Sequence, residues 1–142
     1  MPHRADSRPF PPITISDDPS RVDLGQLAEL FDITWWAKDR PPDQVRRALE
    51  HSHPVLTAWE GERMVGFTRV ISDRTYRATI WDVIVRPSHQ GQKIGAAMID
   101  RTLEELRRQG ALPGSFVGLF TGRPGFYEKV GFSRSGGMSR GL

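Results

Sequence analysis

Cysteine is absent from the 142 residues of this chain. Its absence excludes disulfide bonds, thiolate ligands for a metal and a cysteine nucleophile. It also fits a protein of a reducing compartment, and we expect the cytoplasm and no metal cofactor.

Long apolar segments and strong charge are missing too. No uncharged run approaches the roughly 18 residues of a membrane span, and no apolar segment typical of a secretory signal stands at the N-terminus. The 20 basic and 17 acidic residues leave a net charge of only +3. Because the basic residues are scattered and mostly lie beside acids, we expect neither nucleic acid nor a membrane as partner. For the oligomeric state, we expect a monomer or a homodimer.

Several catalytic motifs do not occur. The chain has no Gly-x-Ser-x-Gly elbow, no His-Glu-x-x-His zinc motif, no Walker phosphate loop and no Gly-x-Gly-x-x-Gly. The enzyme classes that depend on these motifs are therefore not indicated.

The remaining pattern predicts one domain. Four prolines and two arginines in residues 1–12 predict a disordered tail, and residues 13–142 predict a single globular domain. Apolar alternation predicts strands at residues 13–15, 55–59, 64–71, 76–85 and 115–120, with a last strand opening at Phe132. Helical spacing and caps predict helices at 18–31, from the prolines near 41 to about 51, at 94–110 and at 126–130. The sum is an α/β (α+β) fold with helices on both faces of one sheet.

The most informative stretch is residues 83–106, which reads as strand, turn and helix. Pro87 stops a β-branched strand, two glycines lie in residues 90–95, and Ile99, Leu103 and Leu106 form an apolar helical stripe. A glycine-containing turn before a helix N-terminus can bind an anion, because free N–H groups point outward there. The alternative is a tight turn without a ligand.

This stretch resembles the acetyl-CoA motif of the GNAT superfamily of N-acyltransferases. That motif reads Gln/Arg-x-x-Gly-x-Gly/Ala after a strand ending in Val-x-Pro. Gln90, Gly95 and the Val-Arg-Pro before them match it, whereas Lys93 stands where glycine is usual. Gly-Phe-Tyr-Glu-Lys-Val-Gly-Phe at residues 125–132 is similar to the C-terminal Phe-Tyr-x-x-x-Gly-Phe signature. The likeness covers roughly residues 55–132 and includes small bacterial and plastid-type members, some of which acetylate arylalkylamines such as serotonin.

The resemblance implies a GNAT fold with a mostly antiparallel mixed sheet, acetyl-CoA as co-substrate and a set of cofactor contacts. Those contacts are Val83, Ile84, Val85, Gln90, Gly91, Gln92, Lys93, Ile94, Gly95, Ala96, Phe126 and Tyr127. A backbone N–H of residues 83–85 would polarise the thioester carbonyl, and Tyr127 would be the general acid for the coenzyme A sulfur. At position 93, an ammonium could bind the pyrophosphate or a Cβ could crowd it.

The general base is left open by the sequence. Strict alternation would put Thr79, Trp81, Val83 and Val85 on one face of the strand and Ile80, Asp82 and Ile84 on the other. Asp82 is the only acid in this run, so it is either the base or the partner of an arginine. The cluster of His51, Ser52 and His53 is a second candidate, and an amine that arrives neutral would need no protein base.

Three tryptophans are candidates for the acceptor site. In many GNAT enzymes the first two helices and their connector line that site. Trp35 and Trp36 therefore either pack in the core or contact the substrate, and Trp81 is a third candidate for substrate contact. We expect an N-acetyltransferase that transfers acetyl directly to a primary amine, with a small arylalkylamine ranked first. The alternatives are a protein lysine or polyamine acetyltransferase and a non-catalytic acyl-CoA-binding module.

Overall fold

The computed structural model describes residues 12–110 and 115–134. Most of the expected tail, and the end of the chain after residue 134, lie outside these ranges. Within them, none of the helices combines the length and the apolar character that a membrane-spanning segment needs.

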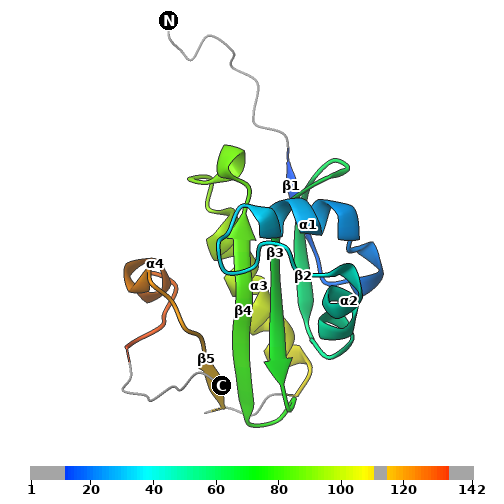
Figure 1. The fold of residues 1–142 in the computed structure, drawn as a ribbon. Coiled ribbons are helices and arrows are strands. Elements are labelled where there is room, and N and C mark those ends of the chain that lie inside the picture. The colour runs from blue at the N-terminus through cyan, green and yellow to red at the C-terminus, as the bar shows by residue number, and fades with distance from the viewer. Residues whose placement is uncertain (1–11, 111–114, 135–142) are drawn as a thin grey trace, which may run out of the picture.

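One five-stranded sheet forms the centre of the molecule, in the order β1-β2-β3-β4-β5 (Figure 1). The strands are β1 Ile13–Ser16, β2 Val55–Glu60, β3 Arg63–Ser72, β4 Arg77–Val85 and β5 Phe116–Gly118. Neighbours from β1 to β4 are antiparallel, whereas β4 and β5 are parallel. The mixed, mostly antiparallel sheet confirms the predicted fold class.

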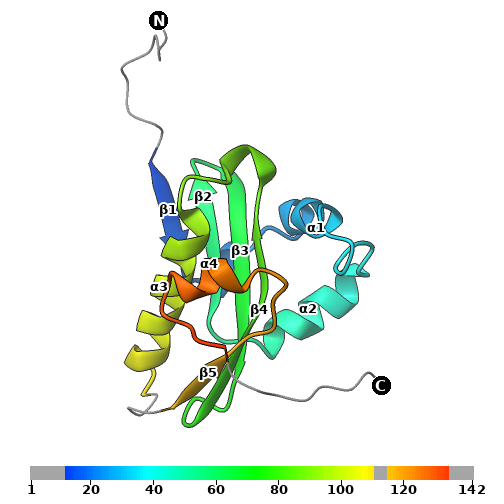
Figure 2. The same cartoon turned by 90° about the vertical axis from the view of Figure 1, so that its left-hand side faces the viewer.

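Helices cover both faces of this sheet. Helices α1 Leu24–Asp32 and α2 Pro42–Glu50 lie on one face and α3 Ile94–Arg108 on the other, while α4 Pro124–Glu128 follows β5 (Figure 2). Short 3-10 turns, η1 Pro19–Arg21 and η2 Pro87–His89, precede α1 and α3.

Each face of the sheet has its own core. Toward α1 and α2, the buried side chains include Leu27, Leu30, Phe31, Phe67 and Ile84. Toward α3 they form two clusters, one with Val70, Ile80, Ile99 and Leu106 and one with Ile94 and Met98. The predicted apolar stripe of α3, with Ile99, Leu103 and Leu106, is therefore confirmed.

Two expected elements are corrected by the structure. The helix predicted to start at Asp18 is broken, because Val22 is extended and the Asp23 side chain caps α1 by accepting from the Gln26 N–H at 3.0 Å. Residues 132–134 are not in a strand, and the rest of the predicted last strand lies outside the described residues. The Phe132 N–H instead donates to the Tyr127 carbonyl at 3.0 Å, which closes the end of α4.

Candidate active site

A β-bulge interrupts β4 at Asp82 and Val83. Trp81 pairs with Arg69 and Ile84 pairs with Phe67, so the single residue Thr68 of β3 faces two residues of β4. Asp82 accordingly has a φ of 56°, in the left-handed region. A bulge leaves part of the ladder unpaired and often lies beside a functional site.

The bulge corrects the predicted alternation of side chains along β4. Ile80 packs in the core toward α3, but Ile84 packs toward α1, although the two are four residues apart. Trp81 shares a face with its partner Arg69, and Asp82 binds Arg69, so both lie on the α1/α2 face. Val83 and Val85 lie on the α3 face. The extra residue thus brings Trp81 and Asp82 to the same side, which strict alternation had separated.

The loop before α3 presents a row of backbone donors. The Ala97 N–H donates to the Lys93 carbonyl as the first bond of the helix, which leaves the N–H groups of Ile94, Gly95 and Ala96 without a helical partner. Among the described residues, the N–H groups of Gly91, Gln92 and Lys93 also make no backbone hydrogen bond. The Gln90 side chain ties this loop to the end of β4 by donating from Nε2 to the Val85 carbonyl at 3.0 Å. Such an array at a helix N-terminus suits a phosphate.

Lys93 occupies the helix N-cap with a φ of 64°, and its side chain makes no capping bond. Glycine adopts this left-handed conformation without steric cost, whereas a residue with a Cβ is strained. The exposed Lys93 side chain therefore brings a cation to the loop together with a strained backbone.

The predicted cofactor contacts differ in their exposure. Ile84 and Ile94 are buried in the core, so only their backbone is available to a ligand. Gly91, Gln92, Lys93 and Gln90 are exposed, and Gly95 and Ala96 are partly exposed.

The start of α3 lies against α4. A Cβ built on Gly95 would come within 3.2 Å of the Phe126 ring, so glycine allows this close packing. Phe126 in turn meets Tyr127 edge-to-face at 4.8 Å between ring centroids. This contact brings the predicted general acid near the loop.

Tyr127 is half-buried and packs edge-to-face on Phe132 at 6.1 Å. Its hydroxyl makes no hydrogen bond among the described residues and is not among the buried atoms left without a partner, so solvent reaches it. Burial raises the pKa of Tyr127 above its usual value of 10, against a smaller opposing effect of Arg123. The phenol is therefore protonated at neutral pH and able to donate.

Asp82 is held by two arginines. Its side chain is 3% exposed and accepts from Arg40 Nη1 and from Arg69 Nε, both at 2.7 Å. Arg40 Nη2 adds a second bond at 3.3 Å, and Arg69 Nη1 donates to Ser52 Oγ at 3.1 Å. The carboxylate thus joins the α1–α2 connector to β3 and β4.

The pKa of Asp82 lies below its usual value. Burial alone would raise it, but the hydrogen bonds and charges of Arg40 and Arg69 together outweigh that effect. An acid of low pKa is a weak base, so the ion-pair interpretation of Asp82 is the one that the geometry favours.

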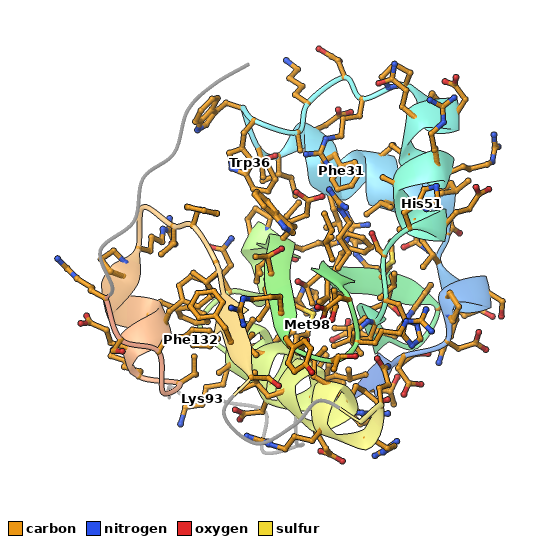
Figure 3. All side chains as sticks on the ribbon, turned by 90° about the horizontal axis from the view of Figure 1, so that it is seen from below. Phe31, Trp36, His51, Lys93, Met98 and Phe132 are labelled. Carbon is orange, nitrogen blue, oxygen red and sulfur yellow. The ribbon has the colours of Figure 1, made fainter. Side chains whose placement is uncertain are left out.

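The histidine candidates lie apart from this group. His51 is exposed at the end of α2, where Figure 3 labels it, and His53 is partly exposed. Ser52 is buried and donates to the Ala48 carbonyl at 2.6 Å. Of these residues only Ser52 joins the Asp82 cluster, through Arg69.

The tryptophans correct the core-packing interpretation. Trp35 is 89% exposed and Trp36 is 43% exposed, both in the connector between α1 and α2. Trp36 lies on the same side of the sheet as Phe31, opposite Met98 (Figure 3). Trp81 is half-buried, and its ring meets the exposed Phe120 at 5.8 Å.

Sequence reasoning missed Arg40, Arg69, Phe120 and the bulge itself. The expected arginine partner of Asp82 could not be chosen from the many basic residues, because the two that bind it are 42 and 13 residues away. Asp82 offered one weak signal for the bulge, since aspartate is enriched among residues with positive φ.

The sequence matches a known protein family and several named relatives. The family model "Acetyltransferase (GNAT) family" matches residues 23–132. The chain is 32% identical over 127 residues to the N-acetyltransferase ycf52 of Porphyra purpurea, covering 85% of this chain and 71% of that protein. It is 34% identical over 128 residues to the chloroplastic serotonin N-acetyltransferase 2 of Oryza sativa, covering 85% of this chain but 62% of the rice protein.

Solved structures of acetyltransferases share this fold. A GNAT-family acetyltransferase from Xanthomonas campestris superposes with a TM-score of 0.79 at 32% identity, covering 94% of this chain and 96% of that one. An aminoglycoside 6'-N-acetyltransferase, solved as a complex with coenzyme A, superposes with a TM-score of 0.72 at 18% identity, covering 87% and 86%. The latter likeness shows the fold alone. The family match and the likeness to the Xanthomonas structure show that this chain belongs to the GNAT family of acetyltransferases and is an acyltransferase.

Proposed function

We propose that this enzyme transfers the acetyl group of acetyl-CoA directly to a small primary amine. The observation that carries the proposal is the contact between the donor array before α3 and the Tyr127 segment, through Gly95 and Phe126. The backbone N–H groups of the array would bind the pyrophosphate of acetyl-CoA, and Tyr127 would donate a proton nearby.

The strands fit this assignment. β4 and β5 pair only as far as Thr79 and Gly118, and the bulge follows on β4. A thioester lying beyond the paired part of β4 and β5 would meet the backbone near Val83, where an N–H of the bulge would polarise its carbonyl. The acceptor would approach from the α1/α2 side, where Trp81 and Asp82 lie.

The chemical step then balances as follows. The lone pair of the neutral amine attacks the thioester carbon, a C–N bond forms and the C–S bond breaks. Tyr127 donates its phenolic proton to the leaving thiolate and is reprotonated from solvent. The nitrogen loses its extra proton to water. Because Asp82 is occupied by two arginines, we assign it to hold them in place, and the amine reacts in its neutral form.

The acceptor side supports an amine with an aromatic body. Trp36 and the Trp81–Phe120 pair offer accessible aromatic faces, which favour flat apolar groups. The name of the rice relative, a serotonin N-acetyltransferase, points in the same direction. Arylalkylamines are therefore ranked above a lysine side chain and polyamines, and the cytoplasmic location stays a prediction.

Two measurements test this function. Acetyl-CoA should raise the melting temperature, since a ligand at 100 times its Kd stabilises by about 2.7 kcal/mol. In a competition with equal tryptamine, lysine peptide and spermidine, tryptamine should be consumed fastest by kcat/KM. Binding of acetyl-CoA without turnover of any amine would support the non-catalytic module instead, and no melting shift would contradict the proposal itself.

A further inference from the structure

A cavity of about 280 Å³ lies on the α1/α2 face, beside the Asp82 cluster. Seven residues line it: Phe31, Arg40, Gln44, Val45, Ala48, Leu49 and Arg69. Its walls are thus mainly apolar, its charged lining consists of two arginines, and no acid lines it. Pockets for small molecules commonly combine apolar walls with a few convergent polar groups.

The charges at one end of the cavity do not cancel. Arg40 and Arg69 carry two positive charges, and both bind the single negative charge of Asp82. No other ion pair of either arginine occurs among the described residues. One positive charge is left over, and it favours an acceptor that carries a carboxylate beside its amine.

Both arginines keep donors available. A guanidinium has five N–H groups, and Arg40 uses only its two Nη atoms on protein while Arg69 uses Nε and Nη1. Within the described ranges, Gln109 Oε1 is the buried side-chain atom left without a partner, so solvent reaches Arg40 Nε and Arg69 Nη2. Asp82 and the packing of Arg40 over Phe31, at 4.7 Å from the ring centroid, fix the orientation of these donors.

We propose that this cavity binds the carboxylate of the acceptor, and that the acceptor is an α-amino acid with an apolar or aromatic side chain. The inference rests on the proposed function, since it concerns the same acceptor site. The remaining N–H donors of Arg40 and Arg69 can bind a carboxylate, whose negative charge neutralises the positive charge left over. An α-amino group, one carbon from the carboxylate, is then held next to Asp82 and hence beside the bulge at Val83. The apolar walls of the cavity receive the side chain.

Three ligands that differ by a single group separate these features. L-phenylalanine has both the amine and the carboxylate, 2-phenylethylamine lacks the carboxylate and 3-phenylpropionate lacks the amine. Titration calorimetry on the coenzyme A-loaded protein should show L-phenylalanine and 3-phenylpropionate binding at least about tenfold more tightly than 2-phenylethylamine. L-phenylalanine should also be the better substrate by kcat/KM.

The variant Arg40→Gln should weaken both carboxylates about 10- to 100-fold, as expected for a lost charge-assisted hydrogen bond, and leave 2-phenylethylamine within about twofold. Arg46→Gln, on the exposed side of α2 and outside the cavity, is the matched control and should change nothing. If Arg40→Gln unfolds the protein, Arg69→Gln also cancels the one positive charge left over beside Asp82, and it should weaken the two carboxylates in the same way.

The proposal is overturned if 2-phenylethylamine binds as tightly as the carboxylates, or if Arg40→Gln weakens all three ligands alike. Its failure is distinct from failure of the proposed function. Rapid acetylation of 2-phenylethylamine without carboxylate binding would sustain the function and overturn the inference. Carboxylate binding without acetyl transfer to any amine would support the inference and overturn the proposed function.

Discussion

Replacing Lys93 with glycine tests the loop before α3 most directly. Lys93 has a φ of 64°, and the left-handed conformation costs a residue with a Cβ about 1–2 kcal/mol. Glycine avoids this strain but loses about 0.5–1 kcal/mol through the greater freedom of the unfolded chain. The free energy of unfolding should therefore rise by about 0.5–1 kcal/mol. For a chain of this length, that corresponds to a melting temperature higher by about 2–4 °C.

Lys93→Ala separates the backbone from the charge. Alanine keeps the strained conformation and removes the ammonium, so any gain that it shares with glycine comes from removing a cation at a helix N-terminus. Differential scanning calorimetry without ligand should place Lys93→Gly above Lys93→Ala in stability. Equal stability of the two variants would refute the strain argument.

The same two variants report on coenzyme A. If the ammonium attracts the pyrophosphate, both should bind acetyl-CoA with a weaker dependence on salt between about 0.05 and 0.5 M, because screening acts on that charge. If instead the Cβ of Lys93 crowds the pyrophosphate, Lys93→Gly should bind acetyl-CoA more tightly at every salt concentration, whereas Lys93→Ala, which keeps that Cβ, should not. An unchanged affinity and an unchanged salt slope would remove Lys93 from the cofactor site.

Four further substitutions test the site. Tyr127→Phe should lower kcat about 10²–10³-fold and leave the Kd for acetyl-CoA nearly unchanged; since burial raises the pKa of Tyr127, the wild-type rate should not fall from loss of this proton as pH rises from 7 to 10, and an early decline would contradict the assignment. Asp82→Asn should lower the free energy of unfolding by about 2–4 kcal/mol at pH 7. Because the pKa of Asp82 is lowered in the folded protein, this difference between variant and wild type should shrink as pH falls below about 4. Lost activity with an unchanged melting curve would instead indicate that Asp82 is a base. Trp36→Ala and Trp35→Ala should leave the melting temperature nearly unchanged, because both side chains are exposed. If neither variant changes the KM for the amine, both tryptophans are excluded from the acceptor site.

Local signals allowed the loop, α3 and the Tyr127 segment to be predicted from the sequence. The strand ending at Val85, the glycines after it and the apolar stripe of α3 all act over a few residues, and the structure places them as expected. The hairpin of β2 and β3 was predicted for the same reason, with Gly61 at a φ of 59° in its turn.

Features that depend on partners far along the chain could not be predicted in this way. The choice of Arg40 and Arg69 for Asp82 depends on how α1, β3 and β4 come together. The exposure of Trp35 and Trp36 depends on the connector lying outside the core, and a tryptophan in a sequence carries no mark of that. The break before α1 depends on two competing caps, Asp18 and Asp23, of which either alone would start a helix.

Asp82 connects these two kinds of information. Its backbone has a φ of 56°, a conformation that aspartate tolerates better than most residues, and its carboxylate binds both arginines. Asp82 therefore contributes its backbone to the bulge and its side chain to the ion pairs with Arg40 and Arg69. At the bulge, the Asp82 side chain lies on the α1/α2 face of the sheet and the Val83 side chain lies on the α3 face. The peptide bond between these two residues therefore joins side chains on opposite faces. Under the proposed function, this placement is a physical reason why we expect the cofactor from the α3 face of β4 and the acceptor from the α1/α2 face.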